Sequence, residues 1–228
     1  MIKNFHSNRR AHNWLIYDIG DKFLNRHKNL YKGVLYDLGC GDSPYRNFFL
    51  HFAESYTGVD WPSSPHEIKA KVIADLNDVL PIESGIADTV ISISVLEHLH
   101  NPQLMISESY RILKDGGYIV LQVPFQWWIH EAPYDYFRYT PFGLKYIFEK
   151  SGFLDVTIEP QSGFFSMWFL KFNYFTLRFI RGPKILRTMI RFSLYPLWYF
   201  LQRIAPFMDR FDDNWQLETI GFFVVARK

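Results

Sequence analysis

Residues 33–44 read GVLYDLGCGDSP, an apolar strand candidate that runs into a turn with two glycines. Glycines at the end of a strand let the backbone approach a bound ligand where a Cβ would collide. Asp60 ends the next strand candidate, residues 55–60, and its carboxylate can accept both hydroxyls of a ribose, because consecutive strand ends lie side by side in a doubly wound sheet. Together these residues indicate a ligand of the adenosine type.

Short apolar runs alternate with longer amphipathic segments beyond this stretch, which is typical of an α/β fold with a parallel sheet. Further strands are expected at 71–75, 88–95, 117–123 and 153–160, with a last strand in 218–228. Helices are expected at 10–27, 43–52, 101–114 and 140–151. A turn at 115–117 would lead back into the sheet.

Composition and charge narrow the class of protein. The chain has 228 residues, 48% of them hydrophobic, and a formal net charge of +2, which allows a domain with a real core and excludes disordered and collagen-like chains. The single cysteine, Cys40, cannot form an internal disulfide, and the first thirty residues contain no apolar run typical of a signal peptide. We therefore expect a cytoplasmic protein.

The turn after the first strand argues against a nicotinamide dinucleotide. The dinucleotide fingerprint requires a third glycine at position 44, and Pro44 stands there. The start of the following helix then lacks the usual binding site for a pyrophosphate.

Four segments, in order, resemble the class I S-adenosylmethionine-dependent methyltransferases of the type 11-like group. They are DLGCGDSPY, GVDWP, IADLNDVLPIESGIADTVISISVLEHLHNP and RILKDGGYIVLQVP. The resemblance covers about residues 30–160 and the last strand. It implies a Rossmann-like α/β fold, with a seven-stranded, mostly parallel sheet, an antiparallel last strand, helices on both faces and S-adenosylmethionine as cofactor. The implied single domain over 1–228 has an N-terminal helical segment at 1–30, a cofactor-binding core at 31–160, a helical insertion at 161–213 and the final strand at 214–228.

The resemblance also implies a cofactor site. Gly39 and Gly41 would pass under the methionine part, Asp37 would fix its amino end, and Asp60 would hold the ribose. Ser43 departs from the pattern, which has a third glycine there, and this makes the loop tighter without abolishing the site. The full set of implied cofactor-binding residues is Asp37, Gly39, Cys40, Gly41, Asp60, Trp61, Asp75, Leu76, Val95 and Leu96.

The segment 127–139 follows the fifth strand, where a parallel sheet presents substrate. It contains an H-x-x-P-x-D-x-x-R pattern that recurs in bacterial methyltransferases of this type. His130 is the best candidate for a base, because imidazole has a near-neutral pKa, and His98 is the second. The candidate acceptor-binding residues are Glu131, Tyr134, Asp135 and Arg138. An alternative is that Asp135 and Arg138 form an ion pair across one turn while His130 caps the loop.

Residues 97–100 read EHLH, and carboxylate and imidazole pairs bind zinc or iron. Related quinone-pathway methyltransferases use a divalent ion near this turn, with another glutamate three positions before the Glu-His pair. Ser94 occupies that position in this chain. The ligand set is then incomplete, and we expect no metal.

The stretch 160–208 contains no Asp or Glu, seven basic residues and fourteen aromatic ones. Its longest uncharged runs have 11 residues, well short of the roughly 20 that span a bilayer as a helix. Lys184, Arg187 and Arg191 share one stripe of a helix, as in helices that lie at a membrane interface, and residues 182–183 separate two such helices. The alternatives are that these helices form a lid on the methyltransferase core or a surface that contacts a second subunit. The small net charge of the chain argues against nucleic-acid binding.

The sequence thus predicts an S-adenosylmethionine-dependent methyltransferase, acting on an oxygen or nitrogen of a small-molecule, lipid-linked or sugar-containing acceptor. It would be a monomer or homodimer, in the cytoplasm or at the inner face of the membrane through 161–208. The alternative from another class is a non-catalytic cofactor-binding module that attaches to a membrane or a partner through the insertion.

Overall fold

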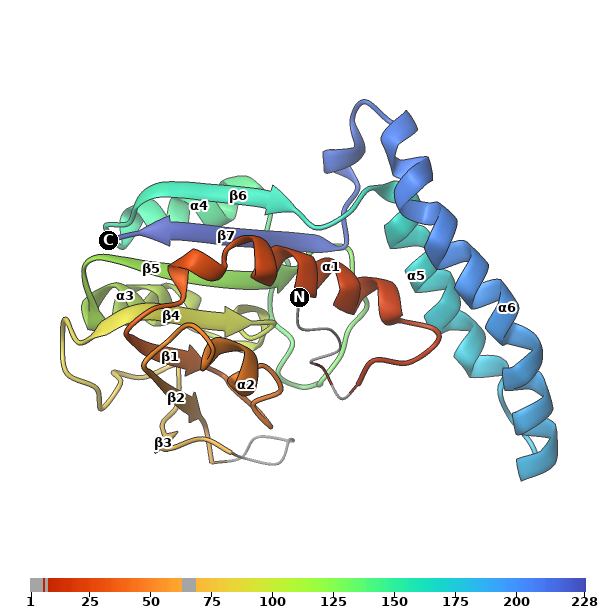
Figure 1. Cartoon of the computed structure of the whole chain (residues 1–228), viewed down its shortest axis with the longest axis horizontal. Coiled ribbons are helices and arrows are strands. Elements are labelled where there is room, and N and C mark those ends of the chain that lie inside the picture. The colour runs from red at the N-terminus through yellow and green to blue at the C-terminus, as the bar shows by residue number, and fades with distance from the viewer. Residues whose placement is uncertain (1–5, 7, 63–68) are drawn as a thin grey trace. The chain divides into compact units, whose positions relative to one another are not determined.

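The computed structural model describes residues 6, 8–62 and 69–228 (Figure 1). The chain divides into two compact units. The sheet unit contains Arg26–Glu159 and Gly221–Lys228, and the helical unit contains the described residues before Arg26 together with Pro160–Ile220.

Within the described residues, the sheet unit is built on a seven-stranded sheet in the order β3-β2-β1-β4-β5-β7-β6. β1 is parallel to both β2 and β4, β4 is parallel to β5, and β7 runs antiparallel to β5. The predicted fold class, a mostly parallel sheet with an antiparallel last strand, is confirmed. The strands are β1 (Val34–Leu38), β2 (Ser55–Asp60), β3 (Val72–Ile73), β4 (Ala87–Ile93), β5 (Leu113–Pro124), β6 (Leu154–Pro160) and β7 (Gly221–Arg227).

Three elements differ from the sequence prediction for local reasons. β3 ends early because Asp75 accepts hydrogen bonds from the backbone and side chain of Asn77, which turns the chain. The helix expected at 43–52 is only α2 (Arg46–Phe49), since the left-handed backbone of Ser43 cannot continue into a helix. The turn expected at 115–117 lies inside β5, where the register shifts opposite Ala87 and Thr89.

Two other helices of the sheet unit, α3 (Pro102–Ile112) and α4 (Pro141–Lys150), begin and end near the predicted residues. The short 3₁₀ helices η1 (Lys28–Leu30) and η2 (Leu96–His98) were not predicted. The Oγ1 of Thr140 accepts a hydrogen bond from the backbone of Gly143 and so caps α4, which has a proline in its first turn. Gly152, with a φ of +99°, follows its end.

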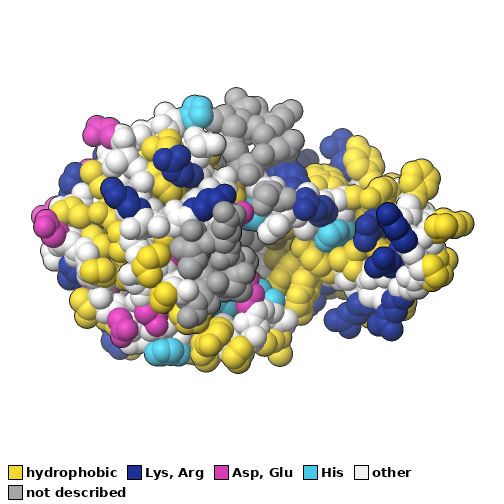
Figure 2. Space-filling view, turned by 90° about the horizontal axis from the view of Figure 1, so that it is seen from below, with side chains coloured by type: hydrophobic (Ala, Val, Ile, Leu, Met, Phe, Trp, Pro, Cys, Tyr) yellow, Lys and Arg dark blue, Asp and Glu magenta, His cyan; other side chains and the backbone are white. Residues whose placement is uncertain are grey.

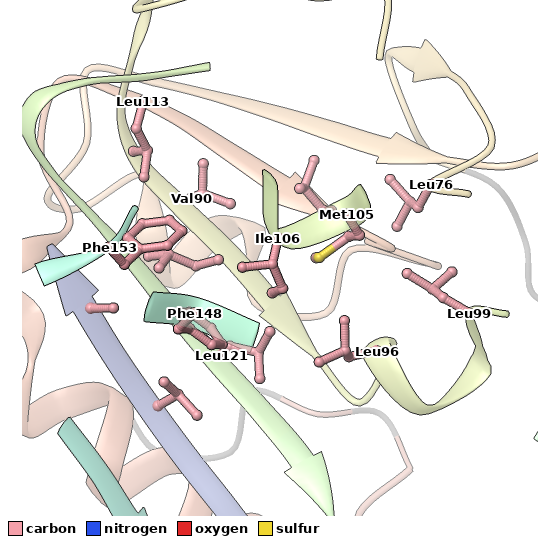
Figure 3. Packing of buried hydrophobic residues seen from close by; sticks show 14 of the residues in the cluster. Leu76, Val90, Leu96, Leu99, Met105, Ile106, Leu113, Leu121, Phe148 and Phe153 are labelled. Atoms are coloured by element: carbon pink, nitrogen blue, oxygen red, sulfur yellow. The ribbon is translucent and has the colours of Figure 1, made fainter. Parts of the chain in front are cut away.

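The hydrophobic core of this unit lies between the sheet and the helices α3 and α4. Figure 3 shows Phe148 of α4 beside Leu121 of β5, with Met105 and Ile106 of α3 among the same layer of side chains. All four are buried. This layer fixes the sheet whose strand ends carry the candidate site.

Two helices of the helical unit, α5 (Phe164–Thr176) and α6 (Lys184–Met208), are separated near Gly182 as predicted. The indole of Trp198 donates to Thr176 Oγ1 at 2.8 Å, and Gln202 bonds both to Trp198 and to the chain around α1. The carboxylate of Asp209 caps the start of α5 by accepting three backbone N–H groups. Its elements are α1 (Trp14–Arg26), α5 (Phe164–Thr176), η3 (Leu177–Phe179), α6 (Lys184–Met208), η4 (Asp209–Phe211) and η5 (Trp215–Leu217).

Among the described residues, no helix has the length and apolar character needed to cross a membrane.

Two phenylalanines of α4 test where the core lies. Phe148 is 0% exposed and Phe142 is 82% exposed. We expect Phe148→Ala to lower the free energy of unfolding by about 3–5 kcal/mol, since it leaves a cavity between α4 and β5. Phe142→Ala should change it by less than about 0.5 kcal/mol. Urea denaturation of the two variants measures the difference, and equal effects would contradict the described packing.

Candidate functional site

The strand order places a ligand crevice at one edge of the sheet. The chain passes from β1 to β2 on one side and later returns to place β4 on the other side of β1. In doubly wound sheets, ligands bind outside the carboxyl ends of the strands at such a reversal. The predicted cofactor and acceptor residues all follow or end strands at this edge, after β1, β2, β3, β4 and β5.

The loop after β1 approaches the turn after β4 very closely. Gly39 has a φ of +80°, and a Cβ on it would lie 2.4 Å from Cγ2 of Val95. Only glycine satisfies both the backbone conformation and the contact. Ser43 stands where the methyltransferase pattern has its third glycine. Its φ of +55° is in the left-handed region, which glycine adopts more easily than serine.

Cys40 lies between the two glycines and is buried. A Cβ on Gly58 would lie 2.6 Å from its Sγ, so the thiol packs against the backbone of β2. Burial raises the pKa of Cys40 to about 12, and the thiol is therefore protonated at neutral pH. This residue shapes the loop and does not supply a nucleophile.

Two buried carboxylates end the neighbouring strands β1 and β2. Asp60 accepts hydrogen bonds from the backbone N–H of Gly41 at 2.7 Å and of Trp61 at 2.8 Å, which ties the end of β2 to the glycine loop. Asp37 accepts one from the Tyr56 hydroxyl at 2.5 Å. Burial raises the pKa of Asp37 to about 7, with the Tyr56 hydrogen bond opposing the rise and the charge of Asp60 adding to it.

These acids fit S-adenosylmethionine, the cofactor that the resemblance implies. A buried carboxylate such as Asp37 is stabilised by a cation, and the cofactor carries an ammonium group. Each oxygen of Asp60 accepts one of the two backbone hydrogen bonds, and a carboxylate oxygen has a further lone pair that can accept a ribose hydroxyl.

Three residues predicted to bind the cofactor have other partners here. Asp75 forms the turn with Asn77 described above, and the side chains of Leu76 and Leu96 are buried in the core. Their contact with the cofactor stays a prediction. Trp61 lies at the end of β2, with its ring edge-on to Tyr134 at 5.2 Å between centroids. This contact brings the loop between β5 and α4, residues 125–140, to the end of β2.

The β5–α4 loop is held to the turn after β4 by backbone hydrogen bonds. The carbonyl of Glu97 accepts from the N–H groups of Tyr136 and Phe137 at 2.9 and 3.2 Å. The hydroxyl of Tyr139 donates to the carbonyl of Leu96 at 3.1 Å. Through these contacts, two segments distant in the sequence form one site.

Asp135 and Arg138 form the ion pair that was considered as an alternative to substrate binding. The guanidinium donates to both carboxylate oxygens, Nη1 to Oδ1 at 2.5 Å and Nη2 to Oδ2 at 2.8 Å, and it lowers the pKa of Asp135 to about 2. Asp135 also accepts from the backbone N–H of His130 at 2.9 Å. The pair therefore stabilises the loop that carries His130. Whether its two members also bind an acceptor stays a prediction.

A cluster of the buried Glu97 and the half-buried His98 and His130 lies where the β5–α4 loop contacts η2. The Oε1 of Glu97 is 3.6 Å from Nε2 of His98 and 3.9 Å from Nε2 of His130, and the two imidazole centroids are 4.7 Å apart. Glu97 is 0% exposed, and burial raises its pKa to about 8. Burial also lowers the pKa of His130.

Glu97 and His98 were predicted as an incomplete metal-ligand pair and His130 as a base, but the contact of Glu97 with both histidines was not predicted. The signal was present in the strand pattern. His98 follows β4 and His130 follows β5, and these strands are parallel neighbours, so their carboxyl ends lie together.

Comparison with known proteins agrees with this architecture. Residues 36–121 match the family model described as a methyltransferase domain. No curated protein matches the chain. The chain is similar to the solved structure of an S-adenosylmethionine-dependent methyltransferase from Archaeoglobus fulgidus, with 20% identity and a TM-score of 0.57 over 92% of this chain and 94% of that one.

Two further solved structures have the same fold. A Mesorhizobium loti S-adenosylmethionine-dependent methyltransferase has 15% identity and a TM-score of 0.58, over 94% of this chain and 100% of that one. The Haemonchus contortus phosphoethanolamine N-methyltransferase 2, in complex with S-adenosylhomocysteine, has 17% identity and a TM-score of 0.56. Its alignment covers 96% of this chain but only 56% of the nematode enzyme. Residues 36–121 thus match a methyltransferase domain, and the chain shares its fold with solved S-adenosylmethionine-dependent methyltransferases.

Proposed function

We propose that the protein transfers a methyl group to an oxygen or nitrogen of a small-molecule, lipid-linked or sugar-containing acceptor, which binds beside Glu97, His98 and His130. The observation that carries this proposal is the contact of Val95 with Gly39. It joins the cofactor loop to the turn that begins the histidine cluster, so that a methyl donor on one side and an acceptor on the other would be neighbours.

Asp37 and Asp60 hold the cofactor in this proposal. S-adenosylmethionine supplies an electrophilic methyl group on a positively charged sulfur. Asp60 accepts the ribose hydroxyls, and Asp37 accepts from the ammonium group of the methionine part. Their fixed positions, set by Gly41 and Tyr56, reduce the cost of orienting the cofactor.

His130 takes up the proton that an acceptor hydroxyl loses, with His98 as the second candidate. The cofactor would supply the methyl group and keep the electrons of the broken bond, and Nε2 of His130 would take up the proton that the acceptor hydroxyl loses. The Nδ1 of this ring lies 3.3 Å from the carbonyl of Trp128 and 3.4 Å from Asp135, contacts that hold its orientation.

The surface of the helical unit supports a lipid-linked acceptor. Ile185, Met189 and Phe192 of α6 are exposed, and so are the basic Lys184, Arg187 and Arg191. At the right of Figure 2, hydrophobic and Lys or Arg side chains lie beside one another over the region that α5 and α6 occupy in Figure 1. Such a surface suits anionic lipid headgroups. A place at the inner face of the membrane, on the cytoplasmic side, is part of this proposal.

Asp60→Ala tests the cofactor site. We expect it to weaken the binding of S-adenosylhomocysteine at least about tenfold, because hydrogen bonds to a charged group contribute about 1.5–3 kcal/mol. Asp78→Ala, which changes an exposed acid in the loop after β3, is the matched control. Calorimetric titration gives both affinities, and NADH should not bind. Unchanged affinity of the Asp60 variant would rule out the assigned ribose contact.

The acceptor class is tested with the same protein. Incubated with methyl-labelled S-adenosylmethionine and fractions of a bacterial cell extract, the wild type should place label in the lipid or glycan fraction. Label that appeared only in tRNA or in protein side chains would contradict the proposed acceptor.

Asp37→Asn tests the buried carboxyl group through pH. The pKa of about 7 in the folded state exceeds the ordinary value of 3.8, so the folded protein binds this proton more tightly and the free energy of unfolding falls as pH rises between these values. Asparagine keeps an acceptor for Tyr56 and does not titrate. We expect the variant to unfold at least about 3 °C above wild type at pH 8, with a smaller gain at pH 5. Thermal scans at both values check this, and an equal gain at both would contradict it.

The double variant Arg187→Glu/Arg191→Glu tests the membrane surface. Each basic residue near an anionic bilayer contributes about 1 kcal/mol to the free energy of membrane binding. The binding of the double variant to phosphatidylglycerol vesicles should therefore be about tenfold weaker than that of wild type, or more. Lys145→Glu, on exposed α4 of the sheet unit, is the control. Sedimentation with anionic and with neutral phosphatidylcholine vesicles measures binding. If the double variant bound like wild type, or wild type bound neither vesicle, the helical unit would not be a lipid surface.

A further inference from the structure

We infer that Glu97, His98 and His130 form a binding site for a divalent transition-metal ion, for which Zn²⁺ is the best match. The first observation is the state of Glu97. Its carboxylate is completely buried, and neither oxygen accepts a hydrogen bond from any described residue. A buried carboxylate without partners is unfavourable by several kcal/mol or more, unless it is protonated or bound to a cation.

One ligand atom from each of the three residues lies within 4.8 Å of the ligand atoms of the other two. Tetrahedral zinc at about 2.0–2.1 Å from each ligand separates ligand atoms by about 3.3 Å. The distances of 3.6 and 3.9 Å from Glu97 exceed this separation by about 0.3 and 0.6 Å. Zinc binding therefore requires side-chain rotations that bring the three ligand atoms closer together.

The second observation is that both imidazoles are held with Nε2 toward Glu97. His98 donates from Nδ1 to the carbonyl of Tyr134 at 2.7 Å, and because a carbonyl only accepts, Nε2 keeps its lone pair. The Nδ1 of His130 faces the carbonyl of Trp128 and the carboxylate of Asp135. Histidines that bind metals almost always donate their other N–H to a carbonyl or carboxylate in this way.

The guanidinium of Arg138 lies beside His130, with Nη2 at 3.4 Å from Nδ1. It is already neutralised by its two hydrogen bonds to Asp135. It therefore leaves the carboxylate of Glu97 without a hydrogen-bonded cation among the described residues.

The ligand chemistry selects the metal. Two imidazoles and one carboxylate form the protein ligand set of one class of catalytic zinc site, in which a fourth position stays open. Mg²⁺ and Ca²⁺ prefer sites made of oxygen ligands. Glu131 lies at the rim, with Oε2 at 3.9 Å from His98 Nε2.

This inference differs from the sequence-based expectation of no metal. That expectation rested on Ser94, which stands where a second glutamate would complete the set. In the structure, the third ligand comes instead from the β5–α4 loop, as His130.

Metal binding itself does not rest on the proposed function, but its consequence for the reaction does. A bound ion occupies the lone pair of His130 Nε2, which then cannot act as a base. The ion replaces that role, because it lowers the pKa of a coordinated hydroxyl group. The metal-loaded and metal-free protein would thus activate an acceptor in two different ways.

Zn²⁺ alone is the probe for the test. The full chain, without a histidine tag and treated with a chelator, should bind one equivalent of zinc in a calorimetric titration against a competing chelator. His130→Ala and Glu97→Gln should each weaken zinc binding by at least about 100-fold, since loss of even an outer partner of a ligand costs about 10–100-fold. Asp135→Asn, which changes only an outer partner, should weaken it less than either.

His100→Ala is the matched control, because His100 is exposed, two positions from His98 and outside the cluster. It should bind zinc like wild type. Co²⁺ in place of zinc should show visible ligand-field bands that disappear in His130→Ala. Thermal unfolding confirms that each variant is folded, and S-adenosylhomocysteine binding is measured in parallel.

Stoichiometric binding that survives His130→Ala and Glu97→Gln, or no stoichiometric binding by wild type, would overturn the inference. In the second case Glu97 would be a protonated acid beside two histidines. Cofactor binding and methyl transfer are measured separately from zinc binding. Absence of a zinc site would therefore not contradict the proposed function, and absence of methyl transfer would not contradict the zinc site.

Discussion

The site depends on the close approach of two turns at one edge of the sheet. Val95 after β4 contacts Gly39 after β1 so tightly that no Cβ fits between them. Because of this contact, the loop that would hold the cofactor and the turn that carries Glu97 and His98 are fixed by the same two parallel strands. A larger residue at Gly39 would separate the turns and strain the backbone at once.

Buried acids are the second common feature of this edge. Asp37, Asp60 and Glu97 all lie in protein interior, and each has a different compensation. Asp60 accepts two backbone N–H groups, Asp37 accepts one hydroxyl, and Glu97 accepts no hydrogen bond from a described residue. A buried carboxylate with fewer hydrogen bonds is stabilised more by a nearby cation, so the need for a cation increases from Asp60 to Asp37 to Glu97. Sites of function commonly retain such unfavourable groups, and the packed layer under α3 and α4 offsets their cost.

Much of the fold followed from local sequence signals. Glycines after β1, alternating apolar runs and the Thr140-Pro141 cap predicted the element order and most boundaries, because each of these features acts over a few residues. The strand predicted at 71–75 was too long, because a hydrogen bond to the side chain of Asp75 turns the chain there. The pairing of His98 with His130 and the isolation of Glu97 depend on contacts between distant segments, which spacing alone does not give. The acceptor and the place of action stay proposals.

The position of β7 has a consequence for how the chain folds as it is made. β7 lies between β5 and β6 in the sheet, yet it follows the whole stretch from α5 to η5 in the sequence. Until the ribosome has added β7, β6 has no neighbour in the sheet and β5 has only β4, so both present unpaired backbone edges. Such edges associate readily with other chains. The nascent protein must therefore remain soluble with an incomplete sheet while about sixty further residues emerge, a stage at which chaperones have most to protect.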